Sequence, residues 1–382
     1  MCALSSVAVV VAACSGGSTP PSSPPGNGLG GSTATPTARP SGAPSASPTP
    51  SGGSVLVVGP GRPYTTVASA VAAAQDGDTI DVIAGTYTND FSDIQSNITI
   101  VGVGGMVHMV ATVPPPNEKS IFVVEKGLTI ENFEISGVAI PASEGNNGAG
   151  IRLDAGNLTV EYCYIHNNQD GILGGVPGNV VSIDHSEFYQ NGAGDGQSHN
   201  LYIGPVASFT FSNSYSHGAL VGHELKSRAT MTSISNSVIA DGPTGTASYD
   251  VDLPDGGVAS ISDSQLEKGP DAQNETVVHY MGENPPPGPY ASNSLTLTGN
   301  TIINDLGANA KVVVDVAIGG QPQITAMLGG NSFYGWSTSQ VIASGSQGDV
   351  ESSNQFFPLA DAPPLDTTPP WQSAPIIPIP PG

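Results

Sequence analysis

The chain reads SHNLYIG at residues 198–204, GHELKSRA at residues 222–229 and SYDVDLPDGG at residues 248–257. Superimposing these stretches aligns three columns of residues: His199, His223 and Tyr249; Asn200, Glu224 and Asp250; and Tyr202, Lys226 and Asp252. The steps between aligned residues are 24 and 26 positions. Self-similarity at this period is typical of stacked structural repeats. The sequence therefore predicts a solenoid, in which each repeat forms one coil.

A second pattern recurs from residue 128 onward in the segments LTIENFEI, LTVEYCYI, VSIDHSEF, FTFSNSYS, TSISNSVI, ASISDSQL and LTLTGNTI. Apolar and polar residues alternate with period two, which predicts strands with one buried face. The sixth position of each segment is occupied by Phe133, Cys163, Ser186, Ser214, Ser237, Ser264 and Asn300. A column of serine and asparagine at one bend predicts a hydrogen-bonded ladder inside the solenoid. We interpret Cys163 in this column as a small packed residue and not as a nucleophile.

The first residues of the expected fold carry a different signal. Residues 64–87 read YTTVASAVAAAQDGDTIDVIAGTY, in which Thr65 or Thr66 can cap a short alanine-rich helix over residues 67–74. This stretch resembles the opening of the right-handed parallel β-helix proteins of the pectate-lyase-like superfamily. The resemblance implies an all-β fold, a single-stranded right-handed parallel β-helix over residues 54–345. The short N-terminal helix would cap the open end of its first coil.

Both ends of the chain differ in composition from the expected solenoid. Residues 1–14, MCALSSVAVVVAAC, resemble the end of a bacterial signal peptide, and residues 11–14 are similar to a lipobox whose Cys14 becomes lipidated. Residues 15–53 contain small residues, polar residues and proline, which predicts a disordered linker. Residues 346–382 form a Pro-rich tail that we expect to be extended. These features predict an exported protein that is lipid-anchored to the bacterial cell surface or outer membrane, or is extracellular.

The charge of the chain restricts its partners. Its 382 residues include 9 Lys or Arg and 32 Asp or Glu, which gives a net charge of −23 at pH 7. Nucleic acids and anionic membrane surfaces attract proteins through positive charge, so neither is an expected partner. The lipid anchor is then the only expected contact with a membrane, and we expect a monomer. Three cysteines are too few for a disulfide framework.

A candidate site lies on a further set of expected strands, one in each coil, which come just before the segments of the second pattern. Their inward residues are Ile151, Ile172, Leu201, Leu225 and Val251. The positions on either side of each inward residue are expected to face outward, and stacked strands lie about 4.8 Å apart. The resulting patch contains Asn200, Tyr202, Glu224, Lys226, Asp250 and Asp252, with His199, His223, Tyr249, Arg152 and Arg228 nearby. Clustered titratable groups indicate a functional site, although paired charges on solvated strands produce a similar pattern.

This patch supports β-elimination on a glycan that contains uronic acids. Such a reaction needs a cation for the sugar carboxylate, a base for the C5 proton and an acid for the leaving oxygen. By resemblance to polysaccharide lyases of this fold, Lys226 is the expected base and Arg228, with Arg152, holds the carboxylate. His223 or Tyr202 is the expected acid. The other residues expected at the site are His199, Asn200 and Tyr249 as substrate contacts, and Glu224, Asp250 and Asp252 as oxygen ligands of Ca²⁺.

Three other functions fit the same patch. Asp250 and Asp252 would lie about 7 Å apart on one strand face, with Glu224 one coil away, which suits an inverting glycoside hydrolase. An epimerase acting on a polyuronate would need the same groups as a lyase. A carbohydrate-binding or adhesive module would use the Tyr and His side chains for stacking and hydrogen bonding. Loops that wall the patch favour an enzyme, and their absence favours the binding module.

Overall fold

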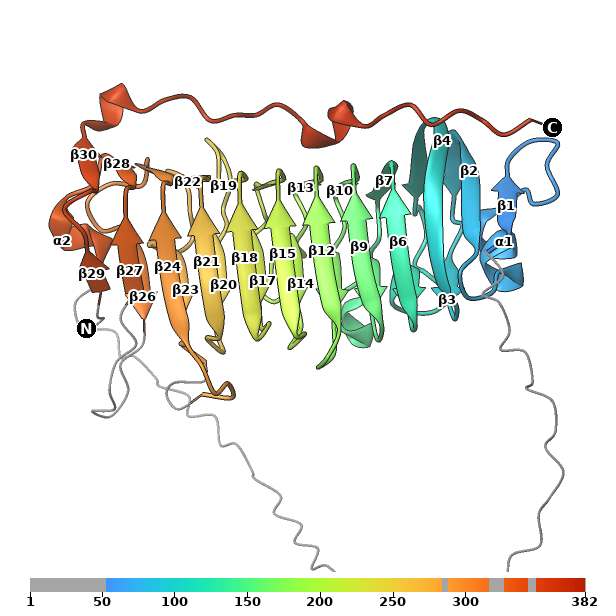
Figure 1. Cartoon of the computed structure of the whole chain (residues 1–382), viewed down its shortest axis with the longest axis horizontal. Helices are drawn as coiled ribbons and strands as arrows, with labels where there is room; N and C mark the ends of the chain where they lie inside the picture. Colours follow the sequence, from blue (N-terminus) through green and yellow to red (C-terminus); the bar gives the residue numbers. More distant parts are fainter. Residues whose placement is uncertain (1–52, 284–287, 316–325, 343–347, 382) are drawn as a thin grey trace, which may run out of the picture. The chain divides into compact units, whose positions relative to one another are not determined.

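The computed structural model describes residues 53–283, 288–315, 326–342 and 348–381 (Figure 1). These residues form one elongated stack of about 10 turns, in which successive coils contribute short strands to the same ladders. The strands pair in parallel with the equivalent strands of neighbouring coils. The fold is therefore the parallel β-solenoid that the repeat predicts. Cys14 and the expected signal peptide lie outside the described residues, as does the linker up to residue 52.

The strands stack into three ladders. The first ladder contains β1 (Val55–Val58), β2 (Thr79–Thr88), β4 (Asn97–Val110), β6 (Gly127–Glu131), β9 (Asn157–Glu161), β12 (Val180–Asp184), β15 (Ser208–Ser212), β18 (Met231–Ser235), β21 (Val258–Ser262), β24 (Ser294–Thr298), β27 (Ala326–Gly329) and β29 (Gly348–Val350). The second ladder continues from the ends of β2 and β4 into β7 (Phe133–Ser136), β10 (Tyr164–His166), β13 (Glu187–Tyr189), β16 (Tyr215–His217), β19 (Val238–Ala240), β22 (Gln265–Lys268), β25 (Thr301–Asn304), β28 (Ser332–Tyr334) and β30 (Gln355–Phe357). The third ladder contains β3 (Ser92–Ile94), β5 (Ser120–Val124), β8 (Ala149–Leu153), β11 (Asp170–Gly174), β14 (Leu201–Ile203), β17 (Leu225–Ser227), β20 (Val251–Leu253), β23 (Thr276–Tyr280) and β26 (Lys311–Asp315).

The bend between the first and second ladders is built in the same way in successive coils. One residue with a left-handed backbone turns the chain, as at Tyr162 (φ 51°) and Asn213 (φ 49°). The next residue points inward, and its backbone N–H donates to the equivalent side chain of the following coil. Ser186 donates to Ser214 over 3.0 Å and Ser214 donates to Ser237 over 3.2 Å. The chain of bonds also includes Cys163 before these residues and Ser264 and Asn300 after them.

This ladder confirms the role predicted for the serine and asparagine column. Each buried backbone N–H at the bend finds a partner, which a buried polar group needs in an apolar interior. Cys163 has the same position in its coil and is completely buried. Burial raises the pKa of its thiol to about 12, so it is a packed residue and not a thiolate nucleophile.

The N-terminal end of the stack is closed by α1 (Val67–Ala73), as the sequence predicts. The Thr66 side chain caps this helix by accepting the Ser69 N–H over 3.2 Å. A carboxylate from the first coil, Asp90, also accepts the N–H groups of Val67 and Ala68 at the positive end of the helix. The other helices are short: α2 (Thr338–Val341) and the 3₁₀ helices η1 (Ala142–Glu144), η2 (Leu359–Asp361) and η3 (Pro370–Ser373). No helix in the described part of the chain is long and apolar enough to cross a membrane.

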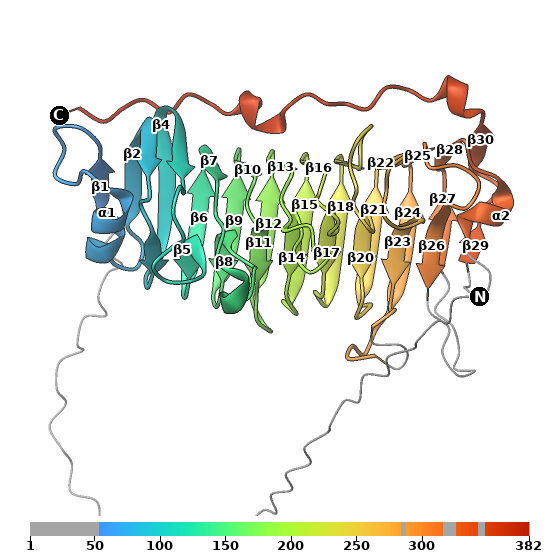
Figure 2. The ribbon, with the colours of Figure 1, turned by 180° about the vertical axis from the view of Figure 1, so that it is seen from behind.

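The C-terminal end departs from expectation. Parallel pairing continues through β29 and β30 to Phe357, beyond residue 345, where we expected the solenoid to end. The tail that follows is extended and returns along the outside of the stack to its N-terminal end (Figures 1 and 2). There Arg62 donates to the carbonyl oxygens of Pro380 and Pro381, and the Gly104 N–H donates to Ile377 O. The tail thus contacts both early and late coils.

Candidate functional site

The third ladder brings four outward side chains into one column. Tyr202, Lys226, Asp252 and His279 are register partners on the consecutive strands β14, β17, β20 and β23. The first three are the residues that the aligned repeats predict as neighbours, and the structure confirms this. Arg152 occupies the same column two coils earlier, where it pairs with Asp154 over 3.1 Å and is separated from Tyr202 by Leu173.

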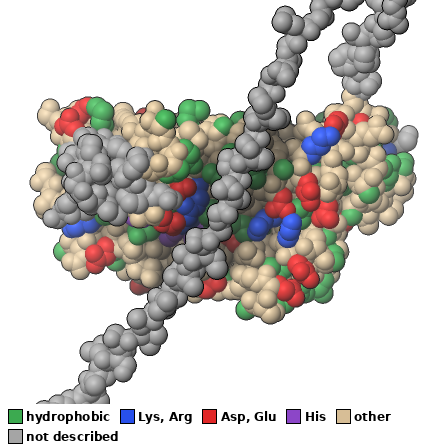
Figure 3. Space-filling view, turned by 90° about the horizontal axis from the view of Figure 1, so that it is seen from below, with side chains coloured by type: hydrophobic (Ala, Val, Ile, Leu, Met, Phe, Trp, Pro, Cys, Tyr) green, Lys and Arg blue, Asp and Glu red, His purple; other side chains and the backbone are tan. Residues whose placement is uncertain are grey.

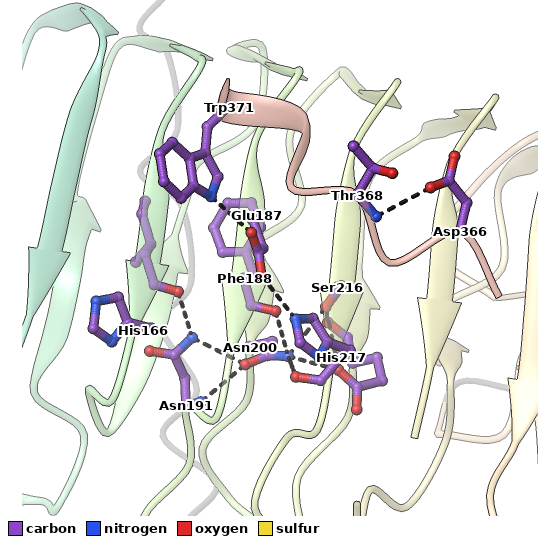
Figure 4. A network of polar contacts seen from close by, with 12 residues as sticks. His166, Glu187, Phe188, Asn191, Asn200, Ser216, His217, Asp366, Thr368 and Trp371 are labelled. Carbon is purple, nitrogen blue, oxygen red and sulfur yellow. Dashed lines mark hydrogen bonds and ion pairs between the residues drawn. The ribbon is translucent and has the colours of Figure 1, made fainter. Parts of the chain in front are cut away.

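The column formed by Asn200, Glu224 and Asp250 does not face outward, so this expectation was wrong. All three residues are completely buried. They lie at the corner between the second and third ladders, where the turning chain points two successive residues inward. Asn200 accepts the Asn191 N–H over 3.0 Å and donates to Glu224 over 2.6 Å, which extends a second internal ladder (Figure 4).

Asp250 belongs to an ion-pair cluster inside the solenoid. The Lys268 ammonium lies 2.8 Å from Asp250 and 3.1 Å from Asp241, and its side chain has no exposure to solvent. Burial raises the pKa of Glu224 and of Asp250 well above the usual range, because the interior disfavours the charged form. The three carboxylates expected to share a calcium ion therefore do not meet, since only Asp252 reaches the outer cluster. Within the described residues, no group of three or more His, Cys, Asp or Glu side chains is arranged to hold a metal ion.

Glu267, which is 3% exposed, gives this buried cluster a measurable pH dependence. Burial, with the negative charges of Asp241 and Asp305, raises its pKa to about 7. An unfolded glutamate has a pKa of about 4.3, so the folded state binds the proton more tightly and stability falls as pH rises from about 4.5 to 7. We expect Glu267→Gln to be more stable than the wild type at pH 8, by about 1–3 kcal/mol, and to show a weaker pH dependence.

Urea unfolding at pH 5 and pH 8 measures this difference directly. The matched control is Glu275→Gln, which changes an exposed glutamate and should keep the wild-type pH dependence. A Glu267→Gln variant whose stability follows that of the wild type at both pH values would contradict the expectation.

Asp252 organises the outer cluster on the third ladder. Its carboxylate oxygens lie 2.8 Å from His279 Nδ1, 3.0 Å from Lys226 Nζ and 3.3 Å from His223 Nε2. Burial opposes its charged form, but the hydrogen bond from His279 and the charge of Lys226 outweigh burial and hold the pKa of Asp252 well below the usual range. Asp252 is therefore an ionised carboxylate that fixes the groups around it.

The two histidines of the repeats stack beside this carboxylate. The rings of His199 and His223 are 4.5 Å apart at an angle of 11°, and Tyr249 continues the stack. His199 Nδ1 accepts the backbone N–H of His223 in the next coil. In the same way, His223 Nδ1 accepts the backbone N–H of Tyr249. Burial lowers the pKa of His199 well below the usual range and that of His223 to about 4. Both rings are neutral at pH 7, with the hydrogen on Nε2.

Lys226 and Arg228 converge on Glu283, a residue of the turn that follows β23. Lys226 Nζ lies 2.7 Å from one oxygen of Glu283, and Arg228 Nη2 contacts the other. The Glu283 side chain is 46% exposed, whereas those of Lys226 and Arg228 are 9% and 18% exposed. Burial lowers the pKa of Lys226, but Asp252 and Glu283 outweigh burial and raise it overall. In this state Lys226 is an ammonium and not the free amine that a base requires.

Tyr202 completes the site. Its hydroxyl accepts a 2.8 Å hydrogen bond from Arg228 Nε, and Lys226 Nζ lies 5.5 Å from the centre of its ring. Arg228 is further fixed by Asp255 at 2.6 Å and by the Tyr290 hydroxyl, which donates to its backbone oxygen. On the face seen in Figure 3, the few Lys and Arg side chains lie beside Asp and Glu side chains, as these ion pairs require.

Sequence reasoning missed four residues of this site, which are His279, Glu283, Asp255 and Tyr290. His279 shares the column of Asp252, and extending the repeat alignment to TVVHY at residues 276–280 would have found it. Glu283 lies in a turn that no repeat predicts. It contacts Arg228, which lies 55 positions earlier in the chain. No periodic signal could have indicated that contact.

Comparison with solved structures identifies the fold. No family model and no curated protein matches the sequence. Among solved structures, an alginate lyase from Paenibacillus sp. str. FPU-7 matches with a TM-score of 0.52 and 19% identity, over 76% of this chain and 94% of that chain. The pectate lyase Pel9A matches with a TM-score of 0.50 and 14% identity, over 80% of this chain and 79% of that chain. The protein thus has the right-handed parallel β-helix fold that these lyases share.

Proposed function

We propose that the protein is a polysaccharide lyase that cleaves a uronic-acid-containing glycan by β-elimination. The observation that carries this proposal is the convergence of Lys226 and Arg228 on one carboxylate, beside the hydroxyl of Tyr202. The chain has only 9 Lys or Arg residues, and two of them lie together at strand β17 and the residue that follows it. The Glu283 carboxylate marks the position that the carboxylate of a bound uronate would take.

Arg228 has the role of holding and neutralising the substrate carboxylate. A guanidinium suits this role because it donates in a planar fork and remains charged. Asp255 and Tyr202 fix its orientation before substrate arrives, so little reorganisation is needed on binding. Neutralising the carboxylate makes the C5 proton more acidic, because the charge of the carbanion spreads onto the carboxylate oxygens.

Lys226 and Tyr202 have the roles of base and acid. When a uronate displaces Glu283, its carboxylate pairs with Arg228, and Asp252 is then the one protein carboxylate that still contacts Lys226. The loss of the Glu283 contact lowers the pKa of the Lys226 ammonium. The neutral amine takes the C5 proton, the electron pair forms the C4–C5 double bond, and the bond from C4 to the glycosidic oxygen breaks. Tyr202 gives its proton to that oxygen. His223 is less suited to be the acid, since its Nε2–H is directed at Asp252.

The geometry does not favour the alternative functions equally. The hydrolase hypothesis needs Asp250 and Asp252 on one outer face, and Asp250 is inside the solenoid. An epimerase would use the lyase groups and differ only in leaving the glycosidic bond intact. The binding-module hypothesis is weakened by Glu283 and Tyr290, which come from the turn after β23 and wall the site against Arg228.

The location of the protein is also part of this proposal. We infer an exported protein that is anchored through a lipid on Cys14 and held off the membrane by residues 15–53. A polymeric substrate outside the cell would be accessible to an enzyme tethered in this way.

A product assay on the full chain tests the function. The protein is incubated with polygalacturonate, alginate and neutral glycans, with calcium and separately with chelator, and unsaturated ends are followed by ultraviolet absorbance together with reducing ends. We expect absorbance on at least one polyuronate, and we expect it to persist in chelator because Arg228 supplies the positive charge that neutralises the substrate carboxylate. Reducing ends without absorbance would indicate hydrolysis, and no product from any polyuronate would contradict the proposal.

A further inference from the structure

A second group of aromatic and acidic side chains lies on the second ladder. A cleft of about 330 Å³ separates this ladder from the C-terminal tail. Strands β13 and β16 form its floor, the turn at residues 241–245 forms one side, and the tail forms another. The residues that matter here are Glu187, Tyr189, Tyr215, His217, Leu365 and Thr367. A volume of this size falls within the range of small-ligand sites, about 300–1,000 Å³.

The floor of the cleft is a stack of aromatic rings. Tyr215 and His217 stack at 3.8 Å and 10°, and Tyr189 stacks on His217 from the preceding coil at 4.4 Å and 22°. Tyr189 and His217 are register partners, so the regular spacing of the coils sets this stack. His217 is stacked against both tyrosines, so the rings present a continuous aromatic surface to the cleft, and the tyrosine hydroxyls offer hydrogen bonds beside it.

The tail is fixed on both sides of the cleft. On one side, Glu187 accepts a 2.7 Å hydrogen bond from Trp371 Nε1 and pairs with His217 Nε2 at 3.0 Å (Figure 4). On the other, the Gln265 side chain accepts the Asp366 N–H over 2.7 Å and donates to Pro364 O. Leu365 and Thr367 lie between these anchors. The wall that they form is therefore present before any ligand binds.

The charge of the cleft indicates which ligand it accepts. Its described lining includes the carboxylate of Glu187 but no Lys or Arg, and the other acidic residue of the lining, Asp241, has its carboxylate buried against Lys268. A sugar carboxylate would be repelled here, in contrast to the site at Lys226 and Arg228. An aromatic surface beside the Glu187 carboxylate and tyrosine hydroxyls suits a sugar ring, which has apolar C–H faces and hydroxyls at its edges. We propose that this cleft is a second carbohydrate site, which binds an uncharged sugar segment.

This inference does not depend on the proposed lyase activity, because the cleft and the Lys226 cluster are built on different ladders. Isothermal titration of the full chain tests it, with cellohexaose, xylohexaose, mannohexaose and chitohexaose as probes and hexagalacturonate for comparison. We expect at least one neutral hexasaccharide to bind, with affinity unchanged in Lys226→Ala. Tyr189→Ala should weaken that binding by about tenfold or more, since aromatic contacts dominate such sites.

Two further variants make the test specific. Tyr334→Ala is the matched control, because Tyr334 is in the same column of the second ladder but is outside the lining of the cleft. It should leave binding unchanged. Thr367→Trp changes an exposed tail residue and should fill the cleft, which abolishes binding without touching the solenoid. Binding of none of the four neutral probes, or equal binding by the wild type and Thr367→Trp, would overturn the inference.

Discussion

Lys226→Ala is expected to lower the rate of polyuronate cleavage by at least about 10³-fold, with the fold retained. The variant loses the base, which typically contributes about 10²–10⁴-fold, and it also loses the ammonium that the amine becomes as it takes the proton, which stabilises the negative charge of the transition state. Asp252 keeps its contacts with His223 and His279, so its carboxylate remains paired. The loss should appear in kcat and kcat/KM, because proton transfer occurs only in the transition state. Initial rates of ultraviolet absorbance give both constants.

Lys119→Ala is the matched control for this prediction. Lys119 also pairs with an aspartate, Asp154, but its side chain is 41% exposed and lies outside the site. Its removal should leave the rate within about twofold, because exposed pairs contribute about 0–1 kcal/mol. Thermal unfolding of both variants separates loss of chemistry from loss of fold. A folded Lys226→Ala enzyme that retains wild-type kcat would remove Lys226 from the mechanism.

Lys268→Met is expected to destabilise the protein by about 3–5 kcal/mol at pH 7. Lys268 is the cation of the internal cluster, and its ammonium contacts Asp241, Asp250 and the Ser248 carbonyl oxygen. Methionine fills a similar volume but leaves two buried carboxylates without a cation. Because their desolvation is the origin of the loss, the penalty should be smaller at pH 5, where these carboxyls take up protons more easily. Urea unfolding at both pH values measures this.

A triple variant makes the test decisive. Adding Asp241→Asn and Asp250→Asn to Lys268→Met removes the unpaired charges and should recover at least half of the lost stability, since a buried ion pair often contributes little net stability. Lys119→Met, at an exposed pair, should change the free energy of unfolding by less than about 1 kcal/mol. An effect of Lys268→Met no larger than that of Lys119→Met would show that the cluster does not depend on its cation.

Much of the site was predictable, because its residues are spaced by the repeat. Tyr202, Lys226 and Asp252 align in sequence, and parallel register turns that alignment into contact. The same logic predicted the internal ladder from Ser186 to Ser264, where one polar residue per coil meets its equivalent in the next coil. Local periodicity carries such information, since a solenoid places equivalent positions side by side.

The tertiary structure decided which residues are outside and which distant segments meet. Alternation with period two assigns faces only while a strand stays straight, and it fails at the corner where Asn200, Glu224 and Asp250 turn inward. Glu283 and the tail residue Trp371 reach their partners Arg228 and Glu187 through segments that follow no repeat. Sequence therefore determined the coil and the register of its ladders, because both arise from short-range periodicity. The Lys226 site and the cleft on the second ladder are completed by irregular segments, and only the three-dimensional path of the chain determines where these fold back.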